Sequence, residues 1–408
     1  MTTKLREGFT TGSAATGAAL AALHLLRQGC APATVRVPLP PFANTQQSDN
    51  GGQPEPRGWL ELPIAACETG PAPELAACWA VNEFDHCDPP PQGIIRSAHA
   101  SVIKDGGDDP DATSGARISA TVIESATPHD SAEVAEPGNI IIKGGPGVGR
   151  VTLPGLPVPV GQAAINPVPR QQIGLALRAQ KYAQPHDPAH ACSTRLTVYV
   201  SVPQGLELAH KTFNPRLGIE GGISILGTQG TVRPYSHAAW KATIEQGLAV
   251  AAATGCRTLC LTTGRRSERL LMERYPELPE RCFVQVADFA QFSLHAAGAM
   301  NFERIVWGCF FGKLVKLAQG HAYTHAKDST LDMQNLAQQA REAKTTSASE
   351  IARCITAAHA LELLLADATG ARVLEQVGQQ AMQTAQNFAG QAVSLHLFHT
   401  DGRELLAL

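Results

Sequence analysis

Residues 258–310 are TLCLTTGRRSERLLMERYPELPERCFVQVADFAQFSLHAAGAMNFERIVWGCF, a stretch in which short apolar runs alternate with helix-like segments. The runs TLCLTT, CFVQVA and RIVWGCF have the composition of buried strands. Between them lie SERLLMERY and a segment from Asp288 to Ala299, for which Asp288 offers an N-cap. GKLVKLAQ follows as a third helix. Strands joined by helical crossovers at this spacing predict a doubly wound, Rossmann-like parallel sheet covered on both faces.

The same α/β pattern extends on both sides of this stretch. Ser236 is placed to cap a helix that reaches Thr254, and Gly255 is placed to end it. Downstream, two or three longer helices are expected near 331–343, 348–366 and 371–388, followed by a last strand, VSLHLFH. Residues 236–408 are therefore predicted to form one α/β domain.

Residues 1–235 have a different pattern, in which strand-like runs dominate. These runs are TVRVPL, IIRSAHASVI, ARISATVI, NIIIK and RLTVYVSV. Two helices are expected, at Ser13–Leu26 and Gln171–Ala183. Pro40–Gly58 is predicted to be a mobile surface loop, and the Gly/Pro-rich residues 143–170 to lack regular structure. This half is predicted to be an α+β domain, so the chain combines α+β and α/β architecture in two domains.

The composition excludes several classes of protein. The 408 residues carry a formal charge of −3, which gives no electrostatic reason to bind nucleic acid or a membrane surface. The uncharged stretches Gly8–Leu26 and Val151–Pro169 are too polar or too rich in proline to span a bilayer, and no targeting segment is expected. Ten cysteines without a CxxC pair match neither a zinc site nor a disulfide scaffold. We expect a cytoplasmic protein without a protein-bound metal, and a homo-oligomer is left open.

The carboxyl ends of the predicted parallel strands are the expected ligand edge of the C-terminal sheet. Thr263 and Gly264 end the first strand, and Asp288 follows the second strand, 24 residues after Gly264. Dinucleotide and S-adenosylmethionine domains place an acid there for ribose hydroxyls. The alternative is that Asp288 caps a helix and does nothing more. Lys313 and Lys316 share one helical face, which suits either a polyanionic ligand or an ordinary solvated surface.

Two N-terminal motifs could hold anions or move protons. TTGS (residues 10–13) lies at a helix start, where free N–H groups and hydroxyls suit a carboxylate or phosphate, and plain capping is the alternative. DGGDDPDAT (105–113) gathers four aspartates, which would raise one another's pKa unless they met cations or N–H donors. These carboxylates could act as a base or accept ligand N–H groups, and a solvated turn is equally consistent.

The most informative segment is TFNPRLGIEGGISILGTQGTVRP (212–234). Its glycines interrupt an apolar run and permit close backbone approach to a flat or anionic ligand. Asn214 and Thr228 offer side-chain hydrogen bonds. A Gly-laced connection between domains is the alternative. GGPGVG (144–149) could cradle phosphates, although it lacks the Walker spacing.

Taken in order, these segments resemble the cobalt-precorrin-5B (C1)-methyltransferase family of anaerobic cobalamin biosynthesis. The resemblance covers about residues 5–325 and rests on LREGFTTGSAATGAA, DGGDDPDAT, GGPGVGRVTLPGLPVPVGQAAINPVPR, SVPQGLELAHKTFNPRLGIEGGISILGTQGTVRPYS and FGKLVKLAQG. It implies that S-adenosylmethionine donates a methyl group to carbon 1 of cobalt-precorrin-5B, giving cobalt-precorrin-6A. The cobalt arrives inside this corrinoid substrate, and the nucleophile is a substrate carbon, so neither a protein metal nor a catalytic triad is required.

Roles for individual residues follow from this resemblance and from the motifs. We expect Thr263, Gly264 and Asp288 to bind the methyl donor, and a donor site in the Gly-rich middle segments is the competing interpretation. Asp108 or Asp109 is the candidate base if a proton must move. The residues expected to bind substrate are Thr10, Thr11, Gly12, Ser13, Asn166, Thr212, Asn214, Gly221, Gly222, Gly227, Thr228, Lys313 and Lys316.

The chain departs from the family pattern at several positions. Where the family commonly has Gly-His-x-Gly-Lys, residues 309–313 are CFFGK, and KDSTLDM replaces the usual Asp-x-Arg after Thr324-His325. Ala14 stands where the family often has cysteine, and residues 43–58 and 124–138 look like insertions. Two other functions stay open on the sequence: a non-catalytic corrinoid carrier, and a phosphotransferase that uses GGPGVG.

Overall fold

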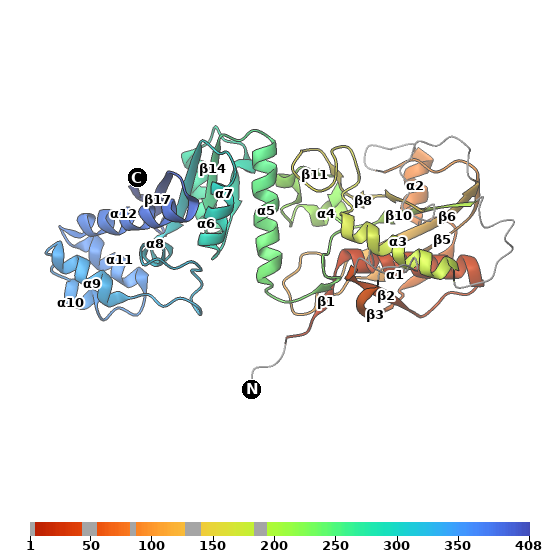
Figure 1. The fold of residues 1–408 in the computed structure, drawn as a ribbon, viewed down its shortest axis with the longest axis horizontal. Coiled ribbons are helices and arrows are strands. Elements are labelled where there is room, and N and C mark those ends of the chain that lie inside the picture. The colour runs from red at the N-terminus through yellow and green to blue at the C-terminus, as the bar shows by residue number, and fades with distance from the viewer. Residues whose placement is uncertain (1–4, 43–54, 82–86, 127–139, 183–193) are drawn as a thin grey trace, which may run out of the picture. The chain divides into compact units, whose positions relative to one another are not determined.

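The computed structural model describes residues 5–42, 55–81, 87–126, 140–182 and 194–408 (Figure 1). The chain divides into two compact units, Met1–Ser236 and His237–Leu408, which are described separately. The fold of the chain is mixed α/β. Most of the two predicted insertions lies outside the described residues.

The N-terminal unit is built on a five-stranded sheet. Three neighbouring pairs are antiparallel, and the last pair, β10 with β7, is parallel. Four of its strands match predicted runs, whereas the short edge strand β4 was not predicted. In spatial order the strands are β4 (Ala66–Thr69), β5 (Ile94–Ile103), β6 (Arg117–Ala126), β10 (Thr194–Ser201) and β7 (Ile140–Gly144).

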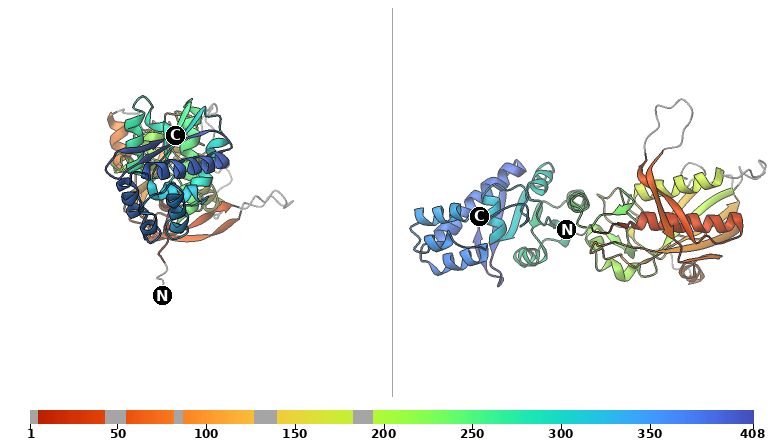
Figure 2. Two further views of the ribbon diagram at one scale, coloured as in Figure 1. Left: turned by 90° about the vertical axis from the view of Figure 1, so that its left-hand side faces the viewer. Right: turned by 90° about the horizontal axis from the view of Figure 1, so that it is seen from below.

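Helices α1 (Thr11–Gln28) and α3 (Pro167–Tyr182) lie side by side on one face of this sheet (Figures 1 and 2). The sheet-facing side of α1 is made of small residues, so the helix axis can approach the sheet closely. The antiparallel hairpin of β2 (Thr34–Phe42) and β3 (Pro56–Pro63) packs against both helices. The prediction of a loop over Pro40–Gly58 is therefore wrong at both described ends of this range, which belong to these strands.

The opposite face of the sheet is covered by α2 (Pro73–Val81), a helix that the sequence analysis missed. Leu75 packs there with Ile123 and Tyr199, all fully buried. The helix is apolar on most of its surface and only nine residues long, so it has no amphipathic period to detect. A second short helix, α4 (Gly205–Ala209), was missed for the same reason of length.

The Gly/Pro-rich segments form a network of two-residue strands, so the expectation that residues 143–170 lack regular structure is wrong. The last part of that segment begins α3 at Pro167, where proline is tolerated because its missing N–H is not needed. Gly147 has a φ of 76°, and a Cβ there would lie 1.8 Å from the Val202 carbonyl oxygen. The pairs are β1 (Gly8–Phe9) with β13 (Thr231–Val232), β9 (Arg150–Val151) with β11 (Ile219–Glu220), and β8 (Gly147–Val148) with β12 (Gly222–Ile223).

The C-terminal unit holds a second five-stranded sheet. Its first four strands run parallel, and the last, β18, is antiparallel and was not predicted. In spatial order the strands are β15 (Phe283–Gln285), β14 (Thr258–Thr262), β16 (Arg304–Phe310), β17 (Val393–Phe398) and β18 (Glu404–Ala407).

Helices cover both faces of this sheet. On one face, α6 (Arg265–Arg274) packs its leucines against Cys260, Val306 and Phe398. The helices on the other face share a larger core with alternate residues of the same strands. They are α5 (His237–Ala253), α7 (Ala290–Gly298), α8 (Phe311–Ala318), α9 (Met333–Glu342), α10 (Ala348–Ile351), α11 (Ala357–Ala366) and α12 (Gly370–Ala389). In the described part of the chain, no helix is both long and apolar enough to cross a bilayer.

Two predictions of helix boundaries in this unit are wrong. The helix expected at 348–366 is split, because Thr356 caps a new helix: its hydroxyl accepts from the His359 N–H at 3.2 Å. Asp288 does not cap a helix, since α7 begins at Ala290 and is preceded by Phe289. The Asp288 carboxylate is used in tertiary contacts instead.

Glu124 on β6 joins the sheet of the N-terminal unit to the end of α1. It is only 4% exposed, and it accepts from Arg27 Nη2 at 2.6 Å and from Arg96 Nε at 2.5 Å. Arg96 also donates to the Leu26 carbonyl oxygen at 2.7 Å, one of the orphan acceptors at the end of the helix. The carboxylate and the two guanidinium groups therefore fix the C-terminal turn of α1 on the sheet.

Replacing Glu124 by Gln should lower the free energy of unfolding of the N-terminal unit by about 2 to 4 kcal/mol, because two cations lose a buried partner. Urea denaturation followed by circular dichroism measures this change. Glu207→Gln is the control: its carboxylate is exposed and lies 3.4 Å from Lys211 Nζ, so a change below about 0.5 kcal/mol is expected. Equal denaturation midpoints for Glu124→Gln and the unmodified protein would contradict the structural role of Glu124.

Candidate functional site

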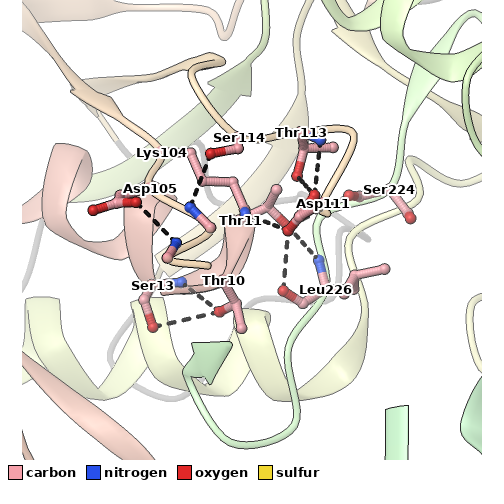
Figure 3. A network of polar contacts seen from close by, with 12 residues as sticks. Thr10, Thr11, Ser13, Lys104, Asp105, Asp111, Thr113, Ser114, Ser224 and Leu226 are labelled. Atoms are coloured by element: carbon pink, nitrogen blue, oxygen red, sulfur yellow. Dashed lines mark hydrogen bonds and ion pairs between the residues drawn. The ribbon is translucent and has the colours of Figure 1, made fainter. Parts of the chain in front are cut away.

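The N-terminus of α1 is closed by the chain itself (Figure 3). Thr10 caps the helix, with Oγ1 accepting from the Ser13 N–H at 3.2 Å. The N–H groups of Thr10 and Gly12 donate to the carbonyl oxygens of Gly230 and Leu226, each at 3.1 Å. The N–H groups of Thr10, Gly12 and Ser13 are therefore not free, because loop 224–230 and the Thr10 hydroxyl supply their acceptors.

Hydroxyl groups extend the same contact. Thr11, only 3% exposed, accepts from the Leu226 N–H at 2.9 Å and donates to the Leu226 carbonyl oxygen at 3.2 Å. Ser13 Oγ donates to the Gly230 carbonyl oxygen at 2.8 Å. A Cβ at Gly227 would lie 2.4 Å from Thr10 Oγ1, so this position requires glycine. The TTGS motif thus acts as a clamp on loop 224–230.

The remaining substrate-site candidates of the N-terminal unit gather around the same loop. The Asn166 N–H donates to the Ile225 carbonyl oxygen at 3.0 Å. Asn214 Oδ1 accepts from Ser224 Oγ at 3.4 Å, and the Asn214 N–H donates to Thr212 Oγ1 at 3.2 Å. Gly221 and Gly222 begin the approach to the loop, and Thr228 lies exposed within it. The structure therefore brings residues 10–13, Asn166, Thr212, Asn214 and the glycines of 221–227 into one neighbourhood.

The aspartate-rich loop is neutralised by cations and N–H donors. The Arg6 guanidinium and then the Gly107 N–H hold the pKa of Asp105 below its usual value. Burial alone would raise the pKa of Asp111, but the Lys104 ammonium at 2.5 Å and the Thr113 donors outweigh it and lower that pKa. The pKa values of Asp105 and Asp111 are therefore lowered and not raised, in contrast to what repulsion among unpaired carboxylates would cause.

The two candidate bases occupy different surroundings in this loop. Asp108 is exposed and accepts from the Arg6 backbone N–H at 2.6 Å. Asp109 is half-buried and accepts from the Tyr235 N–H at 2.9 Å. Among the described residues, neither carboxylate forms an ion pair, and each accepts a backbone N–H.

The C-terminal unit presents Thr263 and Gly264 where β14 ends. Thr263 Oγ1 lies 3.3 Å from Ser267 Oγ, and Gly264 starts α6 by accepting from the Glu268 N–H at 3.0 Å. From β14 the chain moves outward to β15 and then crosses back to β16 on the other side of β14. Strands are therefore added on one side of β14 and then on the other, although β14 and β16 run parallel. An open parallel sheet binds ligands at the carboxyl ends of such a strand pair.

Asp288 and Lys313 meet at this carboxyl edge, although they were predicted for different ligands. Lys313 Nζ forms an ion pair with Asp288 Oδ1, and Thr324 Oγ1 lies 3.3 Å from the same oxygen. Lys316 Nζ donates to the Thr324 carbonyl oxygen at 3.0 Å and is buried. The solvated-face interpretation is therefore wrong for Lys316. Thr324 was missed because it lies 36 residues from Asp288, and only the tertiary fold brings them together.

Three of the departures from the family pattern, at residues 14, 309 and 310, fall at buried or aromatic positions. Phe310, where the family commonly has histidine, lies at the end of β16 with the Arg266 guanidinium 5.5 Å from its ring centroid. Cys309 is fully buried, and burial raises the pKa of its thiol to about 12. Ala14 faces the core of the N-terminal unit. Cys309 and Ala14 are thus packing positions.

Among the described residues, no three histidine, cysteine or carboxylate side chains are grouped so as to hold a metal ion. The buried Lys104 and Ser224 also contribute to the N-terminal site and were not singled out from the sequence. The sequence around neither residue indicates burial. A lysine beside four aspartates is typical of a surface turn, and a serine in an apolar run is typical of a strand.

Comparison with known proteins places the chain in a family. The CbiD family matches residues 1–48 and 92–234, and the family described as CbiD, C-terminal domain matches residues 323–407. A cobalt-precorrin-5B C(1)-methyltransferase of Nitratidesulfovibrio vulgaris is 48% identical, over 98% of this chain and 92% of that protein. The enzyme of the same name from Geobacillus kaustophilus is 40% identical, over 93% of this chain and 83% of that protein.

A crystal structure of the cobalamin biosynthesis protein cbiD from Archaeoglobus fulgidus aligns with 24% identity and a TM-score of 0.33, over 76% of this chain and 78% of that one. The sequence relatives cover nearly the whole chain and share one name, and they confirm the resemblance seen in the motifs. This chain belongs to the CbiD family of cobalt-precorrin-5B C(1)-methyltransferases.

Proposed function

We propose that this chain transfers a methyl group from S-adenosylmethionine to carbon 1 of cobalt-precorrin-5B, giving cobalt-precorrin-6A in cobalamin biosynthesis. The observation that carries the proposal is the 48% identity, over 98% of the chain, to an enzyme named for this reaction. The bound donor supplies an electrophilic methyl group, and the substrate supplies a nucleophilic carbon. The task of the protein is to orient the two reactants and to exclude water.

On the substrate side, we propose that loop 221–230 of the N-terminal unit contacts the macrocycle. Leu226 and Thr228 are exposed in this loop and can meet the ring, whereas Gly222, Gly227 and Gly230 make room for neighbouring segments of the chain itself. Thr10, Thr11, Ser13 and Asn214 are buried and hydrogen-bonded within the protein, so their part is to position this loop. Gly12, Asn166 and Thr212 extend the same support through backbone and turn contacts.

A proton at the reacting centre would pass to the aspartate loop. Asp109 is the stronger candidate, because the Tyr235 N–H fixes one carboxylate oxygen and the other has no partner among the described residues. Asp108 is held in a similar way by the Arg6 N–H. Asp109 could accept a proton without giving up a cation, because no described cation forms an ion pair with it.

On the donor side, we propose that residues 236–408 form a Rossmann-like domain that binds S-adenosylmethionine at Thr263, Gly264 and Asp288. The strand order and the position of these residues at the carboxyl edge support this assignment. Asp288 keeps Oδ2 available for a ribose hydroxyl, since Lys313 and Thr324 contact Oδ1 and no described residue contacts Oδ2. Lys313 holds this carboxylate in place through its ion pair.

The proposed activity is tested by isothermal titration with S-adenosylmethionine and S-adenosylhomocysteine, followed by a labelled-methyl assay with cobalt-precorrin-5B. We expect micromolar binding of the donor and label in the macrocycle. If no donor binding is detected, the titration is repeated with corrinoid present, because an ordered mechanism would require substrate first. Corrinoid binding without any donor binding or methyl transfer would make the chain a carrier and overturn the proposal.

Thr11→Val should raise the KM for cobalt-precorrin-5B by about tenfold, because the Leu226 N–H loses its acceptor and loop 224–230 loosens. The Kd for S-adenosylhomocysteine should stay within about twofold, since the donor site lies elsewhere. Steady-state methyl transfer and titration measure both constants. Thr16→Val is the matched control: Thr16 is equally buried one turn along α1, but its hydroxyl donates to the Gly12 carbonyl oxygen within the helix, at 2.8 Å. Equal effects of the two variants would contradict the role of Thr11 as a clamp.

Asp288→Asn should weaken S-adenosylhomocysteine binding by about tenfold, because a charge-assisted hydrogen bond to a ribose hydroxyl becomes a neutral one. Titration calorimetry gives the Kd. Asp332→Asn serves as the control, since this exposed carboxylate of the same unit caps α9 through the Asn335 N–H at 2.9 Å. Unchanged donor affinity in Asp288→Asn would move the donor site to the Gly-rich segments of the N-terminal unit.

A further inference from the structure

Two lysines and one aspartate meet in the C-terminal unit, and their charges do not balance. Lys313 Nζ pairs with Asp288 and also contacts the Thr324 carbonyl oxygen at 3.2 Å. Lys316 Nζ donates to the same carbonyl oxygen at 3.0 Å. Among the residues that the structure describes, no carboxylate forms an ion pair with Lys316. With both lysines protonated, the cluster has one positive charge in excess.

Solvent does little to offset this charge, because Lys316 is only 6% exposed. A buried ammonium group without a carboxylate partner is strongly disfavoured. Burial lowers the pKa of Lys316, the neighbouring Lys313 lowers it further, and Asp288 opposes both effects. Methionine has a similar length and no charge. If this position were needed only for packing, the folded protein would be more stable with methionine here. Packing alone therefore does not account for a lysine here.

We infer that Lys316 is the receptor for a carboxylate group of a reactant, at the carboxyl edge of the C-terminal sheet. The inference rests on the proposed methyl transfer and sharpens it. Lys316 lies on α8, which begins directly after β16, one of the two strands that flank the expected ligand position. An ammonium has three N–H donors, and the Thr324 carbonyl oxygen takes one of them. An incoming carboxylate would supply both the missing negative charge and further acceptors.

This assignment separates the roles of the two lysines. The charge of Lys313 is already neutralised by Asp288, so Lys313 holds the Asp288 carboxylate in place. Lys316 has only a backbone carbonyl oxygen as partner. Both reactants of the proposed reaction carry carboxylates: the donor has one on its amino-acid chain, and the macrocycle has acetate and propionate side chains. The chemistry recognised is the same in either case, and binding experiments distinguish the two sources.

The test is Lys316→Met, compared with the unmodified enzyme in two binding measurements and one kinetic measurement. If the donor's carboxylate binds Lys316, the Kd for S-adenosylhomocysteine should rise about 10- to 100-fold. The Kd for 5′-methylthioadenosine, which lacks the amino-acid chain, should not change. If a carboxylate of the macrocycle binds instead, both nucleoside affinities should stay unchanged and the KM for cobalt-precorrin-5B should rise by the same factor. No change in any of the three constants would overturn the inference.

Thermal unfolding without ligands provides a second readout. A cation kept for a ligand leaves the free protein less stable, so Lys316→Met should unfold at the same temperature or a higher one. A drop of several degrees would mark Lys316 as a structural cation and overturn the inference. Lys344→Met is the control, since Lys344 is exposed in the same unit and should change neither binding nor stability. Absence of methyl transfer by the unmodified enzyme would instead overturn the proposed function, and the inference with it.

Discussion

The close packing of α1 on its sheet is the constraint on which the N-terminal unit depends. Alanine and glycine on most of its buried surface let the helix lie between the sheet and the β2–β3 hairpin, beside α3. Such a helix has little freedom to slide, because interiors are packed without room for larger side chains. Its two ends are then fixed by different means: Glu124 and two arginines hold the C-terminal turn, and loop 224–230 closes the N-terminus. The candidate substrate loop is thereby held against α1, which is a rigid element.

Backbone rather than side chains builds the surroundings of that loop. Two-residue strands and glycines carry the chain from 144 to 149 past 219–223, and a Cβ at Gly222 would lie 2.1 Å from the Gly147 carbonyl oxygen. Contacts this close leave few alternative conformations, so the segment is ordered despite its content of glycine and proline. The peptide groups of these segments pair with one another, so the backbone holds loop 224–230 in place.

The elements predicted well from the sequence are those with a strong local pattern of apolar residues. TLCLTT, RIVWGCF and VSLHLFH are apolar runs of strand length between helix-like segments, and each became a parallel strand. The failures have tertiary causes. Asp288 matches the pattern of an N-cap, but an ion pair with Lys313 competes for its carboxylate, and that partner lies 25 residues away. Likewise the TTGS motif predicts exposed N–H donors, and only the folded chain shows that Leu226 and Gly230 accept from them. Local chemistry identified these residues, whereas the partners that define their roles come from distant segments.

Two clusters in this chain have the same ratio of charges and reach opposite outcomes. Glu124 accepts from both Arg27 and Arg96, and the Arg96 side chain is 45% exposed, so each cation has either the carboxylate alone or the carboxylate and water. In the other cluster Asp288 forms an ion pair with Lys313 but not with Lys316, and Lys316 has neither a carboxylate partner nor appreciable solvent. In the first arrangement both guanidinium groups contact the carboxylate, so it is structural. The second is satisfied only when a further anion arrives, which makes its excess charge a property of the ligand site rather than of the fold.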